Sequence, residues 1–145
     1  MKQKAQNEFL LEFPSRSSNE AFARSAVAGF AAQLDPTLGE LEDIKTAVSE
    51  AVTNAIVHAY PDSIGKVSIR CRICPGNELE LTVKDKGIGI ADIDQARRPS
   101  FTTGGSERSG MGFTIMESFM TNLDISSRPG KGTTVHMRRK LQRRQ

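Results

Sequence analysis

The stretch LELTVKDKGIGIAD, residues 79–92, joins the end of an apolar, β-branched run to a glycine-rich loop. The run ends at Asp85, and Gly87 and Gly89 follow it, each with an isoleucine after it. The loop is no dinucleotide fingerprint, because Asp92 stands in place of the third glycine, and GxxxxGK[ST] occurs nowhere in the chain. A lone Gly-x-Gly is typical of an ordinary turn. Its meaning therefore depends on the rest of the chain.

The segments on both sides of this loop predict an α+β fold. We expect strands over residues 7–14, 65–74, 78–85, 123–127 and 132–139, and helices over about 18–34, about 37–59 and from about 110. The turn at residues 75–77 is short, so the strands beside it should pair antiparallel. Residues 91–109 lack a clear period and predict a long loop. This order predicts a two-layer sandwich, a mainly antiparallel mixed sheet with helices on one face.

The two predicted upstream helices have recognisable signals. In the first, Ser17 or Ser18 can act as the N-cap, and Phe22, Ala26, Val27 and Phe30 recur at helical spacing as its apolar residues. In the second, an apolar stripe predicts one continuous helix to about residue 59.

Composition limits the class of protein. The chain has 145 residues, 37% of them hydrophobic, which is enough for one domain over residues 1–145. We find no apolar run of the roughly 18 residues that a membrane span needs and no signal-peptide block, so we expect a cytoplasmic protein without membrane contact.

The cysteines and the net charge argue against two further classes, disulfide-bonded proteins and nucleic-acid-binding proteins. Cys71 and Cys74 lie three apart on a predicted strand, so they point to opposite faces and should be free thiols. The formal net charge is only +3, and much of the excess lies in residues 136–145. Because no nucleic-acid module accompanies this basic end, we expect no direct nucleic-acid binding.

Three polar residues of the second helix are spaced by four. Glu50, Asn54 and His58 therefore share one flank, offset from the apolar stripe. Glu50 could orient or deprotonate a nucleophile, and Asn54 could offer a neutral oxygen to Mg²⁺. Each residue alone also fits a simpler interpretation, a solvated helix face or, for His58, a hydrogen bond at the helix end.

A second Gly-x-Gly, Gly110 and Gly112, opens the helix that follows the long loop. Free amides and the dipole at a helix start favour phosphate, and Arg108 could add a cation. The chain contains four features in this order: Glu-x-x-x-Asn, Asp-x-Gly-x-Gly, a long loop and this Gly-x-Gly. The specificity of the prediction comes from the whole constellation.

The sequence resembles the ATP-binding superfamily of DNA gyrase, Hsp90, histidine kinases and MutL, whose fold is the Bergerat-type ATP-binding fold. The boxes SEAVTNAIVHAY (49–60), DKGIGI (85–90) and RSGMGF (108–113) carry the resemblance, which runs essentially end to end. FARSAVAGFAAQLDPT (22–37), ERSGMGFTIMESFM (107–120) and GKGTTV (130–135) are most similar to the small serine-kinase anti-sigma factors.

This resemblance implies roles at one end of an ATP/ADP site. Asp85 would accept the adenine amino group, Gly87 and Gly89 would let the loop approach the base, and Thr133 would lie near the same end. Ile88 and Ile90 would give apolar cover.

The resemblance also implies a phosphate end. Asn54 would bind Mg²⁺, Glu50 would activate the attacking hydroxyl, and residues 92–109 would form a lid. Six residues would wrap the phosphates: Arg108, Ser109, Gly110, Met111, Gly112 and Phe113.

The implied function is an anti-sigma factor that sequesters a sporulation sigma factor as a homodimer. As a protein serine kinase it would phosphorylate and inactivate an anti-anti-sigma partner, and Arg24 is the candidate for a contact shared by both partners. Two alternatives stay open. One is a nucleotide-dependent sigma-binding module without kinase activity, and the other is a histidine-kinase catalytic fragment, although His58 and His136 are the only histidines and neither precedes the site on a suitable helix.

Overall fold

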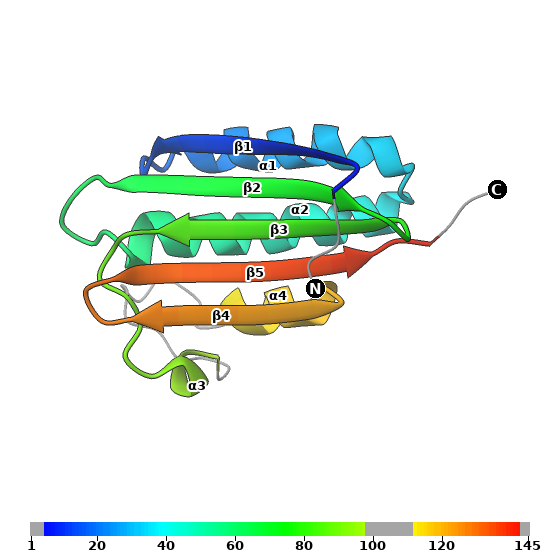
Figure 1. Ribbon diagram of the computed structural model, residues 1–145. Helices are drawn as coiled ribbons and strands as arrows, with labels where there is room; N and C mark the ends of the chain where they lie inside the picture. Colours follow the sequence, from blue (N-terminus) through cyan, green and yellow to red (C-terminus); the bar gives the residue numbers. More distant parts are fainter. Residues whose placement is uncertain (1–4, 98–111, 143–145) are drawn as a thin grey trace.

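The computed structural model describes residues 5–97 and 112–142, and its strands form one sheet (Figure 1). The spatial order is β1-β2-β3-β5-β4, and each pairing of neighbours is antiparallel. The predicted α+β sandwich is confirmed, and no parallel pair occurs among the described strands. The strands are β1 (Asn7–Pro14), β2 (Lys66–Cys74), β3 (Glu78–Asp85), β4 (Asn122–Arg128) and β5 (Gly132–Lys140).

Three helices, α1 (Asn19–Ala31), α2 (Leu38–Thr53) and α4 (Gly112–Phe119), form the second layer on one face of this sheet (Figure 1). Within that layer α2 packs against both α1 and α4. A short 3-10 turn, η1 (Ala32–Leu34), follows α1, and a single helical turn, α3 (Ile93–Ala96), lies beyond β4 in Figure 1. No helix in the described ranges is long and apolar enough to cross a membrane.

The helix α2 begins with a reciprocal cap. The Glu40 amide donates to Thr37 Oγ1 at 3.0 Å, and the Thr37 amide donates to Glu40 Oε1 at 2.9 Å. Such a capping box satisfies two amides that a helix start otherwise leaves without partners. The capping box fixes where α2 begins, and therefore which residues lie at the C-terminal end of α2, beside the candidate site.

The core lies between α2 and the inner face of the sheet. Val48 and Val52 of α2 and Leu81 of β3 are completely buried, as are Val27 of α1 and Met116 of α4. Alternate residues of the strands face this layer, which is the pattern that predicted them. Both cysteines are free thiols, as predicted, and both are buried.

The end of the second predicted helix differs from the prediction. The α-helix ends at Thr53, and Asn54–His58 form a π turn, η2, in which the Ala59 amide donates to Asn54 O at 3.1 Å. Each π turn holds an extra residue, and such turns are often found at functional sites. The prediction of one regular helix to Ala59 was therefore wrong in its last turn.

The first helix also differs in detail. Ser18 is the N-cap residue but makes no side-chain capping bond. Phe22, one of the apolar residues that predicted this helix by their spacing, is 53% exposed. The buried stripe is instead Ala23, Val27 and Ala31, spaced by four, and Phe22 lies about 100° around the axis from it.

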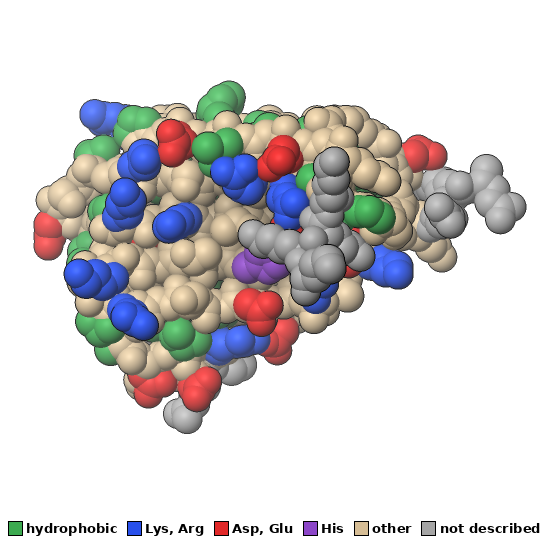
Figure 2. Space-filling model, viewed as in Figure 1, with side chains coloured by type: hydrophobic (Ala, Val, Ile, Leu, Met, Phe, Trp, Pro, Cys, Tyr) green, Lys and Arg blue, Asp and Glu red, His purple; other side chains and the backbone are tan. Residues whose placement is uncertain are grey.

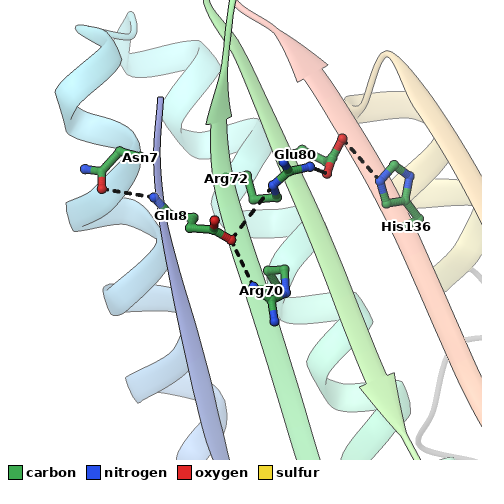
Figure 3. A network of polar contacts seen from close by, with 6 residues as sticks. All are labelled: Asn7, Glu8, Arg70, Arg72, Glu80 and His136. Carbon is green, nitrogen blue, oxygen red and sulfur yellow. Dashed lines mark hydrogen bonds and ion pairs between the residues drawn. The ribbon is translucent and has the colours of Figure 1, made fainter. Parts of the chain in front are cut away.

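The opposite face of the sheet carries charged side chains of both signs (Figure 2). Glu8 of β1 accepts from Arg70 of β2 at 2.9 Å, and Arg72 donates to Glu80 of β3 at 2.8 Å. His136 Nε2 of β5 lies 3.5 Å from the second oxygen of Glu80 (Figure 3). These pairs connect four neighbouring strands, so the polar face is an organised part of the fold.

Candidate nucleotide site

A cavity of about 350 Å³ lies where β3 and β5 meet η2, the glycine loop and the start of α4. Most of its wall is apolar, with a few polar groups, which is the usual character of a small-molecule site. Its lining residues are Ala51, Asn54, Ala55, His58, Ala59, Val83, Asp85, Ile88, Gly89, Ile90, Ala91, Asp92, Gln95, Ala96, Gly112, Phe113, Thr133 and Val135.

The helical wall joins two motifs that are distant in the sequence. Asn54 and His58 line the cavity from η2, and Gly112 lines it from α4. A Cβ on Gly112 would lie 3.3 Å from both Asn54 Nδ2 and Glu50 Oε1. The start of α4 therefore lies directly against Glu50 and Asn54, and the helix start can present its amides beside both side chains.

Asp85 is the buried one of two aspartates, Asp85 and Asp92, in the described wall of the cavity. Its side chain lies at the end of β3 and is only 6% exposed. Oδ1 accepts from the Gly87 amide at 2.9 Å and from the Thr133 amide at 3.1 Å. Within the described ranges Oδ2 accepts no hydrogen bond and no cationic side chain pairs with the carboxylate. Burial raises the pKa of Asp85, and the two amides only partly oppose it.

The glycine loop is held between η2 and the turn that joins β4 to β5. The Ile88 amide donates to Ala59 O at 2.9 Å, and the Gly130 amide donates to Ile88 O at 2.6 Å. A Cβ on Gly87 would lie 2.1 Å from Ala59 O, and one on Gly89, at φ +77°, would lie 2.0 Å from Arg128 O. Both glycines are thus required by close backbone packing, whereas their approach to a base stays a prediction.

Part of the predicted phosphate segment lies outside the described residues. This holds for Arg108, Ser109, Gly110 and Met111, and for residues 98–109 of the predicted lid. Asp92 at the start of that lid caps α3 by accepting from the Gln95 amide at 3.0 Å, and Arg97 pairs with Glu117 of α4. Phe113 is described, buried, and in the cavity wall.

Arg24 lies on α1 and is not in the cavity wall. Its guanidinium is 3.7 Å from Glu20 Oε2 and 3.5 Å from Ser49 Oγ, and Ser49 donates to Glu20 at 2.7 Å. Since Ser49 precedes Glu50 on α2, this polar cluster lies beside the helix that carries Glu50. The side chain of Arg24 is 40% exposed and can still meet a partner.

Ser127 of β4 does not line the cavity but contacts two residues that do, and sequence reasoning missed it. Its hydroxyl accepts from the Ile90 amide at 2.7 Å and lies 2.8 Å from Thr133 Oγ1, so it contacts both the glycine loop and the buried Thr133. The alternation of β4 could have located it, because Leu123, Ile125 and Ser127 share the less exposed face of that strand.

Comparison with known proteins defines the class. Residues 13–139 match the family model of the histidine kinase-like ATPase domain. The RsbU and RsbW domains of Rv1364c from Mycobacterium tuberculosis superpose with a TM-score of 0.70 at 18% identity, over 96% of this chain and 34% of that chain. A blue-light activated histidine kinase from Erythrobacter litoralis EL346 superposes with a TM-score of 0.60 at 24% identity, over 81% of this chain and 40% of that chain. These two structures share the fold. Together with the family match, they define an ATP-binding domain of the histidine kinase-like class.

Curated relatives define the family within this class. The anti-sigma F factor of Pasteuria penetrans is 54% identical over 138 residues, covering 94% of this chain and 92% of the relative. That of Oceanobacillus iheyensis is 54% identical over 137 residues, covering 93% of each. The chain belongs to the anti-sigma F factor family. Members are ATP-dependent protein serine kinases, so the predicted enzyme class is confirmed, and the interpretation as a histidine-kinase fragment loses its support.

Proposed function

We propose that this chain binds and sequesters a sporulation sigma factor, and that it uses Mg²⁺-ATP to phosphorylate a serine of an anti-anti-sigma partner. One observation carries the site assignment. The cavity has a buried carboxylate, Asp85, in one part of its wall, and in another part α4 starts against Glu50 and Asn54. A base and a polyphosphate could therefore occupy separate ends of one pocket.

Asp85 would form the adenine end. Its second oxygen is available to accept from the adenine amino group, while guanine would present a carbonyl oxygen there and be repelled. Ile88 and Ile90 line the same cavity and would cover the ring, and Thr133 lies beside the carboxylate. This arrangement supports selection of adenine nucleotides.

Asn54 would hold the metal at the phosphate end. No group of three or more His, Cys, Asp or Glu side chains that could hold a metal occurs among the described residues. The site nevertheless fits Mg²⁺, which keeps several waters, takes few protein ligands and is completed by phosphate oxygens. Gly112, Phe113 and residues 108–111 would wrap the phosphates, and closure of residues 92–109 as a lid would exclude water.

Glu50 would orient the serine hydroxyl of the partner and accept its proton. Phosphoryl transfer asks the protein chiefly to position groups and to neutralise charge. The position of the Glu50 carboxylate beside the helix start that would meet the phosphates supports this role. Arg108 would add positive charge.

Transfer of labelled phosphate tests this assignment. Wild-type protein, Mg²⁺, labelled ATP and a candidate anti-anti-sigma protein should give labelled phosphoserine, and Glu50→Gln should abolish the label while ADP affinity stays within about twofold. Unchanged transfer by Glu50→Gln would refute the role of Glu50. Sigma capture by a wild-type protein that transfers nothing would favour the binding module.

Arg24 would contact both the sigma factor and the anti-anti-sigma partner, and the sigma complex would contain a homodimer of this chain. Its exposed guanidinium, held by Glu20 and Ser49, supports this role. Arg24→Ala should weaken binding of both partners by about tenfold or more, a loss of roughly 1.4 kcal/mol. Lys45→Ala, which removes a surface cation of α2 paired with Glu42, is the matched control.

A further inference from the structure

The hydroxyl of Ser127 makes three contacts at the adenine end of the cavity. It accepts from the Ile90 amide at 2.7 Å, donates to Gly132 O at 2.9 Å, and lies 2.8 Å from Thr133 Oγ1. A serine hydroxyl has one proton to donate and two lone pairs that accept. Three contacts therefore use its whole capacity.

The protons can be assigned by elimination. Gly132 O is a carbonyl oxygen and can only accept, so the Ser127 proton points to it. Ser127 Oγ must then accept from Thr133, which means that the Thr133 proton points to Ser127 and away from the cavity. Thr133 lines the cavity, and with its proton held by Ser127 its hydroxyl can offer only lone pairs to a group in the cavity.

We propose that Ser127 is a positioning residue for nucleotide selection, because it keeps the Thr133 hydroxyl an acceptor toward the cavity. The inference rests on the proposed adenine end. Asp85 and Thr133 adjoin, since the Thr133 amide donates to Asp85 Oδ1 at 3.1 Å. Together they make a wall of acceptors, which suits the amino group at C6 of adenine and repels the carbonyl at C6 of hypoxanthine.

Without Ser127 this selectivity should fall. The Thr133 hydroxyl would lose its acceptor, could rotate, and could then donate to a carbonyl at C6. General loosening of the loop through Ile90 would weaken both kinds of nucleotide alike. The ratio of the two affinities therefore separates positioning from a merely structural role.

The test measures ADP and IDP binding by calorimetry on the full chain. For Ser127→Ala we expect the ratio of the IDP to the ADP dissociation constant to fall about three- to tenfold, as for loss of one neutral hydrogen bond. Ser127→Thr keeps the hydroxyl and should keep the wild-type ratio. Ser126→Ala, at an exposed position one residue earlier on β4, is the matched control and should also keep it.

A double-mutant cycle makes the test specific. Thr133→Val should lower the ratio by itself, and adding Ser127→Ala to it should change the ratio no further. Thr133→Val also serves if Ser127→Ala does not fold. A wild-type ratio in Ser127→Ala, or in Thr133→Val, overturns the inference.

Asp85→Asn separates this inference from the proposed function. If it weakens ADP binding while Ser127→Ala keeps the wild-type ratio, the inference alone is wrong. If Asp85→Asn leaves ADP affinity unchanged, the adenine end is wrong and the inference falls with it.

Discussion

Glu80 and Asp85 lie five positions apart on β3, yet their surroundings differ in kind. Glu80, on the outer face, accepts from Arg72 at 2.8 Å and lies 3.5 Å from His136. Burial acts to raise its pKa, but the hydrogen bond from Arg72 and the electrostatic interactions with Arg72 and His136 outweigh that effect, so the pKa of Glu80 is lowered. Asp85, at the cavity, accepts only from neutral backbone donors among the described residues, and burial raises its pKa.

The difference separates a carboxylate that is paired with side chains of the fold from one that accepts only from backbone amides among the described residues. Glu80 is neutralised by side chains of adjacent strands and so contributes to holding β2, β3 and β5 together. Asp85 is buried, and no cationic side chain among the described residues pairs with it. Burial of this kind disfavours the charged form of the carboxylate and costs folding free energy. A carboxylate kept in this state is a candidate for binding a donor that comes from outside.

The largest expected effect concerns ligand binding. Asp85→Asn keeps Oδ1 for both backbone amides but replaces the second oxygen with a donor. ADP affinity should fall about 10- to 100-fold, because a hydrogen bond to a charged acceptor contributes roughly 1.5–3 kcal/mol. Calorimetric titration checks this.

Glu80→Gln is the control for that variant, since it makes the same change on the same strand. Glu80→Gln should leave the affinity for ADP within about twofold of the wild-type value. Equal losses in both variants would mean that the two carboxylates do not differ in role.

The next effect concerns stability. Arg72→Ala leaves Glu80, whose side chain is 13% exposed, without its closest cation. The free energy of unfolding should fall by about 1–3 kcal/mol, because a largely buried carboxylate loses its hydrogen bond from a charged donor. Urea denaturation followed by circular dichroism measures it, and an unchanged midpoint would show that this pair contributes nothing.

The smallest effect is a pH dependence of stability. Because folding lowers the pKa of Glu80 below its ordinary value of 4.5, the stability that Glu80 contributes is present above that pH and is lost as the pH falls through the folded-state pKa. The difference in unfolding free energy between wild type and Glu80→Gln should therefore shrink on acidification from about pH 6 to about pH 3. A difference that grows would reverse the assigned sign.

The strands and the main boxes could be predicted because they depend on local patterns. Alternation located β2 and β3, and the position of Asp85 after an apolar run placed it at a strand end. The pairing of Arg72 with Glu80 needs the register of β2 against β3, in which they are direct partners. Local patterns do not supply that register.

Other features depend on tertiary contacts. The π turn at Asn54–His58 follows no sequence signal that we used, and the tight contact of Gly87 with Ala59 O requires the loop to reach η2. Phe22 shows the limit of helical spacing. The stripe that faces the core consists of Ala23, Val27 and Ala31, and helical spacing alone did not distinguish it from the stripe that contains Phe22.

A structure of the chain with ADP and Mg²⁺ tests the central claim most directly. We predict that the adenine amino group lies within hydrogen-bond distance, about 3 Å, of Asp85 Oδ2, and that the phosphates and the metal lie at Asn54 and the start of α4. A base bound at the start of α4, or phosphates directed toward Asp85, would contradict the account.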